Sequence, residues 1–198
     1  MRLIRTCSIL LLCALTASLA QAQEKSSGRK KDGAKKPTPF QKNLAFNAIS
    51  FSVSSPGTDS GNTVTITPKG LKVDNTIITL PIEGKVQDIL FGDIDSDSWP
   101  ELIVWVAGNG KSPAIIHGYT VNNGLNLRPF TTSSLNLKEG LTEGLNGQEE
   151  YQIGNNVLMY RFPIFKGSKK TGKTRQLQYS LLTTDDAKQL WFERSSEY

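Results

Sequence analysis

One short acidic segment has the residue types and the spacing to bind a metal ion. Between residues 91 and 102 the chain reads FGDIDSDSWPEL, in which carboxylates alternate with other residues. A tight loop can wrap oxygen ligands around Ca²⁺ by offering them at alternate positions, one of them through a backbone carbonyl. The ligands predicted for such a site are Asp93, Asp95, Asp97, Trp99 through its carbonyl, and Glu101.

This segment resembles the calcium loops of integrin-type FG-GAP propeller blades, which share the pattern FGD-x-[DN]-x-D-x-x-P-[DE]-L-x-V. Those loops favour glycine where this chain has Ser96 and Ser98, and a propeller needs several copies where this chain has one. Clustered carboxylates also repel one another unless a cation or solvent relieves them. Three interpretations stay open: a calcium loop, a solvated acidic turn, and a carboxylate pair for glycoside hydrolysis.

A second segment, GSKKTGKT at 167–174, matches the phosphate-binding P-loop pattern G-x-x-x-x-G-K-[ST]. That motif requires a buried strand before it and a helix after it, so that the helix N-terminus faces the phosphates. Pro163 interrupts the preceding apolar run, and Leu177, Tyr179 and Leu181 alternate with polar residues as in a strand. The flanking sequence therefore predicts a lysine-rich hairpin loop and no nucleotide.

Few residues could serve as nucleophiles or general bases. Cys7 and Cys13 lie in an N-terminal segment expected to be removed, so the mature chain would have no disulfide and no cysteine ligand. A Ser-His-Asp triad would need His117, the one histidine, which lies in the alternating stretch AIIHGYTV and is expected to be structural. We predict that the protein is not an enzyme, with carboxylate chemistry left open.

The N-terminus has the organisation of an exported protein. Arg2 and Arg5 precede the apolar stretch 8–20, and Ala-Gln-Ala then offers a cleavage site, which together predict a signal peptide at 1–22 and no transmembrane anchor. Residues 23–39 are rich in Lys, Ser, Gly and Pro and are predicted to be a disordered basic linker. Beyond residue 36, 15 basic residues face 16 acidic ones, so we expect no nucleic-acid partner.

The remaining residues, 40–198, read as short alternating segments separated by turn signals. This pattern predicts one all-β domain, an antiparallel β-sandwich. ELIVWVA at 101–107 is almost continuously apolar, as in a central strand, and Asn-Gly at 123–124 predicts a hairpin turn, as does Gly-Asn-Asn at 154–156. The other strands are expected at 44–53, 62–67, 76–82, 85–91, 114–121, 125–130, 149–153, 157–162, 175–182 and 188–193.

The segment GQEEYQIGNNVLMYRFPIFKGSKKTGKTRQLQYSL at 147–181 resembles the bacterial periplasmic inhibitors of invertebrate-type lysozyme. In that family G-x-[DE]-E-[FY] leads into a strand ending R-F-P-[IV]-[YF], and T-R-Q-[IL]-Q-Y follows after a polar loop. This chain has Gly147 with Glu149, Glu150 and Tyr151, then Arg161 to Phe165, then Thr174 to Tyr179. The resemblance extends over residues 85–198 through the Asp93-x-Asp95 to Pro100-Glu101-Leu102 segment, the Tyr119 to Gly124 hairpin and the C-terminal end.

The resemblance implies an exported, periplasmic β protein without catalysis, which plugs the active-site cleft of a lysozyme with a protruding loop. The lysozyme that the resemblance implies is an invertebrate-type one. No cofactor is required, calcium stays an option, and homodimer formation stays open. The alternative function is a calcium-dependent envelope module that binds glycan or protein through the acidic loop at 93–101. Arg161 and Arg175 are expected to pair with Glu149 or Glu150 within the scaffold. In that family the main loop is a Ser/Gly-rich stretch that carries a tyrosine; here Ser112 matches, and Pro113 stands where the tyrosine is expected. The partner-binding loop implied for this chain consists of Gly108, Asn109, Gly110, Lys111, Ser112 and Pro113.

Overall fold

The computed structural model describes residues 37–58, 60–108, 113–132, 140–184 and 187–198. The predicted signal peptide and most of the predicted linker therefore lie outside the described residues. Within them the chain forms twelve strands, and all strand pairs are antiparallel. None of these residues belongs to a helix with the length and hydrophobicity of a membrane span. The all-β prediction is thus confirmed for this part of the chain.

The first four strands pair in chain order and form the N-terminal sheet. Phe51 and Val53 alternate with half-buried or exposed serines, so that one face of the sheet is apolar. The single strand predicted at 44–53 is wrong, because Asn47 adopts a positive φ of 53° and turns the chain into a hairpin. The strands are β1 (Phe40–Phe46), β2 (Ile49–Ser55), β3 (Asn62–Lys69) and β4 (Ile78–Ile82).

The next four strands form the central sheet, again in chain order. Strand β6 is buried along nearly its whole length, because Leu102 and Val104 point into one hydrophobic core and Ile103 into another. This burial on both faces explains the continuous apolar run that predicted a central strand. The strands are β5 (Val86–Gly92), β6 (Glu101–Val106), β7 (Ile115–Asn122) and β8 (Asn126–Phe130).

The last four strands form the C-terminal sheet, with the order β12-β11-β10-β9. Strand β10 passes straight through Pro163, contrary to the predicted interruption, and shifts its register between Pro163 and Phe165. Among the described strands only β11 pairs with β10 at this position, so Pro163 lies at an edge of the sheet, where proline is tolerated. The strands are β9 (Glu150–Gly154), β10 (Val157–Lys166), β11 (Lys169–Thr184) and β12 (Ala187–Glu197).

The GSKKTGKT segment forms the hairpin between β10 and β11 rather than a P-loop. The strands are joined at Gly167 and Ser168, and Lys166 lies opposite Lys169. Because the chain continues as a strand where a P-loop needs a helix, the hairpin prediction is confirmed.

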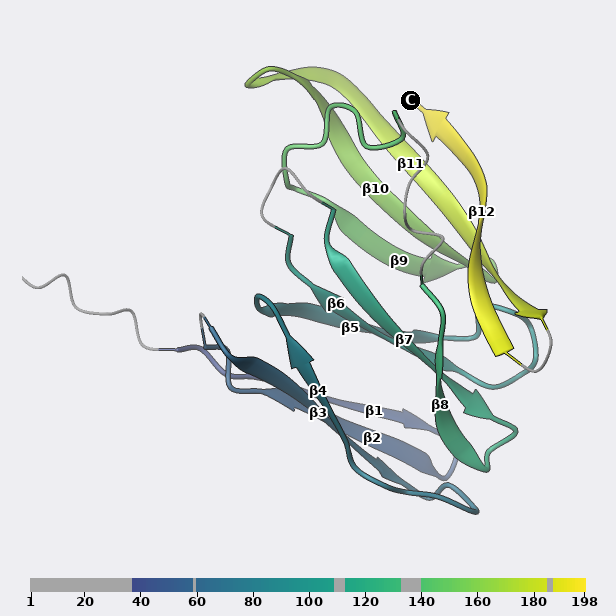
Figure 1. The fold of residues 1–198 in the computed structure, drawn as a ribbon. Coiled ribbons are helices and arrows are strands. Elements are labelled where there is room, and N and C mark those ends of the chain that lie inside the picture. Colours follow the sequence, from purple (N-terminus) through teal and green to yellow (C-terminus); the bar gives the residue numbers. More distant parts are fainter. Residues whose placement is uncertain (1–36, 59, 109–112, 133–139, 185–186) are drawn as a thin grey trace, which may run out of the picture. The chain divides into compact units, whose positions relative to one another are not determined.

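The three sheets stack as three layers, with the central sheet in the middle (Figure 1). One core joins side chains of the N-terminal and central sheets, including Phe51, Ile66 and Val104. The other joins the central and C-terminal sheets through residues such as Ile103 and Tyr160. The prediction of a single sandwich is therefore corrected to two sandwiches that share one sheet, since the central sheet buries apolar side chains on both faces.

Candidate functional site

The acidic loop between β5 and β6 is held together by its own carboxylates. Asp93 accepts hydrogen bonds from the backbone N–H of Ser96, at 2.7 Å, and of Ser98, at 3.1 Å. Asp97 accepts one from the N–H of Trp99, at 2.7 Å. Ser96 and Ser98 adopt positive φ values of 63° and 70°. These are the two positions at which the resembling calcium loops have glycine, which reaches this conformation without strain.

Lys188 of β12 places its ammonium group inside this loop. Its Nζ atom lies 2.5 Å from Asp95, 2.6 Å from Asp97 and 3.5 Å from Glu101. It also donates a hydrogen bond to Thr120 Oγ1 at 3.0 Å. Burial alone would lower the pKa of Lys188, but the hydrogen bonds to Asp95 and Asp97 raise it above its ordinary value. The ammonium group is therefore charged, and it relieves the repulsion among the carboxylates.

Glu101 is the buried member of the acidic group. It is fully shielded from solvent and accepts hydrogen bonds from the N–H of Ile94 and the hydroxyl of Thr120, both at 2.8 Å. Burial raises the pKa of Glu101 to about 7, while these hydrogen bonds and Lys188 act in the opposite direction. Glu101 therefore changes charge near neutral pH.

The predicted calcium ligands are only partly brought together. Oxygen atoms of Asp93, Asp95 and Glu101 lie within 4.8 Å of one another. Asp97 turns to Lys188, and the Trp99 ring packs edge-on against Phe46, with centroids 6.0 Å apart. Because an ammonium group already binds the carboxylates, the arrangement as it stands does not fit a calcium ion. Calcium binding stays a prediction that requires displacement of Lys188.

The loop predicted to bind a partner begins and ends in described residues, while Asn109, Gly110, Lys111 and Ser112 lie outside them. Its C-terminal end is anchored at Ala114. The hydroxyl of Tyr151 donates a hydrogen bond to the Ala114 carbonyl at 3.4 Å, and the Ala114 amide hydrogen-bonds the Glu149 carboxylate. The hydroxyl of Tyr160 donates a further short hydrogen bond to Glu149. Two residues of the segment at 147–151 thus fix the point at which the loop rejoins the sheet.

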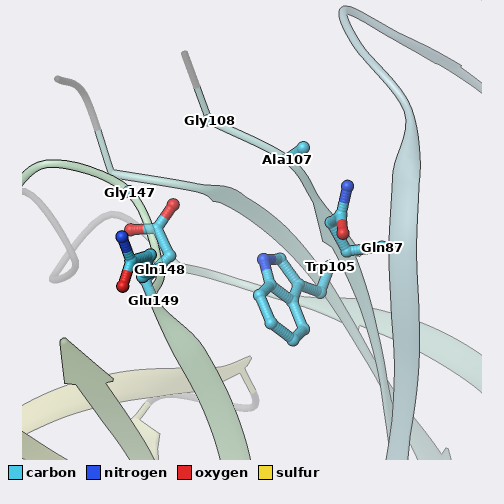
Figure 2. A pocket seen from close by; sticks show the side chains of 7 residues that line it. All are labelled: Gln87, Trp105, Ala107, Gly108, Gly147, Gln148 and Glu149. Atoms are coloured by element: carbon cyan, nitrogen blue, oxygen red, sulfur yellow. The ribbon is translucent and has the colours of Figure 1, made fainter. Parts of the chain in front are cut away.

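A pocket of about 280 Å³ opens beside these anchors. In Figure 2 the side chains of Gln148 and Glu149 lie on one side of it, and Trp105 lies on the other. Burial raises the pKa of Glu149, whereas its hydrogen bonds with Tyr160 and Ala114 oppose that shift. The complete lining consists of Gln87, Trp105, Ala107, Gly108, Gly147, Gln148 and Glu149.

The two arginines of the C-terminal sheet belong to the scaffold. Arg161 lies 3.6 Å from Glu150 and also hydrogen-bonds Gln176, as expected for a structural pair. Arg175 pairs with Glu197 at 2.6 Å rather than with Glu149 or Glu150. It also donates hydrogen bonds to the backbone carbonyls of 140, 141 and 143. Arg175 therefore holds the connection before β9 against the sheet.

Two features of these sites were missed from the sequence. Lys188 is separated from Asp97 by 91 positions, and nothing in its own segment signals an acidic partner. Trp105 lies in β6 of the central sheet, whereas Glu149 directly precedes β9 of the C-terminal sheet. The sequence did contain one signal for the pocket. Trp105 follows a run of aliphatic residues in β6, and its indole N–H needs a hydrogen-bond partner when it is buried.

Comparisons with known proteins add no assignment. No protein-family model matches the chain, and neither a curated protein nor a solved structure gives a significant match. The likeness to lysozyme inhibitors, drawn from the motifs alone, therefore stays a prediction about function.

Proposed function

We propose that this chain is an exported, non-catalytic inhibitor of lysozyme, which occupies the enzyme's active-site cleft with the loop at 108–113. The observation that carries the proposal is the double anchoring of Ala114 by Glu149 and Tyr151. These two anchors belong to the segment with the most specific likeness to the inhibitor family. They lie next to the loop that the same likeness implies as the contact.

A cleft-plugging loop gains affinity when it is held in place before binding, because less conformational entropy is then lost on association. The anchoring residue Tyr151 is itself packed among aromatic side chains. Tyr151 stacks on Tyr160 with ring centroids 4.6 Å apart, and Tyr151 and Trp105 meet edge to face with centroids 5.5 Å apart. Strands β9 and β10, which carry Tyr151 and Tyr160, are paired through this region.

The chemistry of the target also favours binding through this loop. Lysozyme cleaves its glycan with carboxylic acids in a groove, so an inserted loop must provide donors to those groups. Lys111 and Ser112 supply an ammonium and a hydroxyl at the centre of the implied contact. The positive charge of Lys111 complements the negative charge of the enzyme's carboxylates most strongly once Lys111 is desolvated in the cleft.

The experiment is a binding and lysis assay with the mature chain, residues 23–198, against invertebrate-type, chicken-type and goose-type lysozymes. Replacing Lys111 and Ser112 with alanine should weaken binding by about 2 kcal/mol or more if they are central contacts. The matched control replaces Ser168 and Lys169 in the β10–β11 hairpin with alanine and should leave the dissociation constant unchanged. Failure to bind any of the three enzymes would overturn the proposal. An unchanged affinity of the Lys111 and Ser112 variant would remove the loop from it.

A further inference from the structure

We propose that the pocket between Trp105 and Glu149 binds the acetamido group of an N-acetylated amino sugar. This activity goes beyond lysozyme inhibition and does not rest on it. A chain with both properties would bind an N-acetylated glycan as well as the enzyme that cleaves such a glycan.

The pocket offers a donor that the protein leaves unused. The indole N–H of Trp105 is buried and has no hydrogen-bond partner among the described residues. Such groups are rare in folded proteins, because burying a donor without a partner forfeits its hydrogen bond to water. In Figure 2 the indole nitrogen is on the side of the ring that faces Glu149. Because the nitrogen is shielded in the structure, an acceptor from the pocket satisfies it after a small shift of the side chains that cover it.

The opposite wall offers an acceptor in a fixed position. The carboxylate of Glu149 is half-buried and is held by the Tyr160 hydroxyl and the Ala114 amide. Two carboxylate oxygens together have about four acceptor positions, so these bonds leave capacity for one more donor. The aromatic packing of Trp105 on Tyr151, and of Tyr151 on Tyr160, keeps the donor and the acceptor in their relative places.

The backbone at this wall is strained. Gly147 and Gln148 have positive φ values of 72° and 59°. Apart from asparagine and serine, Gln148 is the one non-glycine residue in the described part of the chain with this conformation. A residue held in the left-handed region costs stability, and such residues gather at binding sites. Here the strain places Gln148 and Glu149 side by side on the pocket wall (Figure 2).

A secondary amide matches this pair of groups. Its carbonyl accepts from Trp105, and its N–H donates to Glu149 from the opposite side. An ammonium or guanidinium group has only donors and would leave the indole unsatisfied, while a carboxylate would meet Glu149 with like charge. The methyl of an acetamido group would contact Ala107 and the indole ring, and the amides of Gln87 and Gln148 line the same pocket, where they can meet sugar hydroxyls. A volume of about 280 Å³ holds such a group with part of the attached ring.

Nuclear magnetic resonance of the ¹⁵N-labelled mature chain tests the proposal directly. The chain has three tryptophans, and the spectrum of the Trp105→Phe variant assigns the Trp105 indole signal. N-acetylglucosamine is added to about 50 mM, since single sugars bind weakly. Glucose, glucosamine and N-acetylasparagine amide serve as parallel titrations. We expect a saturable shift of the Trp105 signal with N-acetylglucosamine, and none with the two sugars that lack the acetamido group.

Two variants test whether the response to the sugar arises in this pocket. Glu149→Gln should weaken the sugar response at least fivefold, because the acceptor becomes neutral. The control Glu83→Gln changes an exposed carboxylate outside the pocket and should leave the response unchanged. Retained dispersion of the amide signals shows that each variant is folded. The proposal is overturned if Trp105 does not shift with N-acetylglucosamine, if glucose shifts it equally, or if only the asparagine compound does. The lysozyme-binding assay does not affect these outcomes, so the two proposals fail separately.

Discussion

The ammonium nitrogen of Lys188 lies 2.6 Å from a carboxylate oxygen of Asp97, although the two residues are 91 positions apart in the sequence. Lys188 belongs to the C-terminal sheet, and the acidic loop joins two strands of the central sheet. Beside this pair the backbone of Thr131 exchanges hydrogen bonds with 188 and 190, both at 2.9 Å. One side chain thus offsets part of the negative charge of the loop and links two sheets.

Replacing Lys188 with methionine removes the ion pairs between Lys188 and the acidic loop. Methionine keeps much of the side-chain volume but leaves Asp95, Asp97 and Glu101 without their cation. We expect the free energy of unfolding to fall by about 3 kcal/mol, the usual cost of breaking a largely buried ion pair. Urea denaturation at pH 7 measures it, with Lys169→Met as the control. Lys169 is exposed and has no acidic partner among the described residues, so equal losses in both variants would show that the Lys188 contacts add nothing.

The same substitution should change the response to calcium. In the unaltered chain the ammonium group competes with any cation for the loop carboxylates. Without it, Asp93, Asp95, Asp97 and Glu101 present hard oxygen ligands of the kind that Ca²⁺ prefers. We expect millimolar Ca²⁺ to raise the melting temperature of Lys188→Met by about 5 °C and to leave the unaltered chain unchanged. Calcium stabilisation of the unaltered chain would instead support a native calcium loop.

The buried carboxyl of Glu101 should make stability depend on pH. Its pKa rises from 4.5 to about 7 on folding, chiefly through burial. A group with a raised pKa favours the folded state in its protonated form. Its contribution is therefore full below about pH 4.5 and is lost as the pH rises to about 7. Relative to Glu101→Gln, the melting temperature of the unaltered chain should fall across this window and level off above it.

Scanning fluorimetry over closely spaced pH values follows that difference. Comparison with the glutamine variant cancels the contributions of other carboxyl groups that the two proteins share. A relative melting temperature that rises between pH 4.5 and 7 would contradict the expectation. It would mean that Lys188, rather than burial, controls the ionisation of Glu101.

The loop serines at positive φ should carry a measurable strain. Ser98 is exposed and has a φ of 70°, and its side chain takes part in none of the hydrogen bonds found among the described residues. Ser98→Gly keeps the backbone N–H that donates to Asp93 and relieves the strain, so we expect a gain of about 0.5 kcal/mol in unfolding free energy. Ser54→Gly in β2, an exposed strand position, should lose stability instead. Urea denaturation compares the two, and a loss at Ser98 would show that its conformation is unstrained.

Gly118 should be intolerant of any side chain. A Cβ atom placed there would lie 2.1 Å from two ring atoms of Phe130, which is packed in the second core. We expect Gly118→Ala to cost about 2–3 kcal/mol, because the ring has to shift within a filled core. Gly154→Ala is the matched strand control, where the new atom meets only the flexible end of Met159 at 3.0 Å. Similar unfolding free energies for the two variants would show that the Phe130 ring moves freely.

Local features were well predicted from the sequence because their causes are local. Alternation of apolar and polar residues located most strands, and the turns at 122–124 and 154–156 follow from asparagine and glycine in the left-handed conformation. The continuous apolar run of β6 correctly indicated a central strand. The error at 44–53 has the same local origin, since a single asparagine turn at Asn47 interrupts an otherwise regular pattern.

The sequence by itself determined that this chain builds antiparallel strands, where most of them lie, and that an acidic loop lies within residues 91–102. Only the tertiary structure decided that the strands form three layers and that Lys188 pairs with the carboxylates of the loop. It also brought Trp105 and Glu149 to one pocket. The reason is physical. Strand and turn preferences depend on neighbours along the chain, whereas sheet stacking and charge pairing depend on surfaces contributed by residues far apart in sequence.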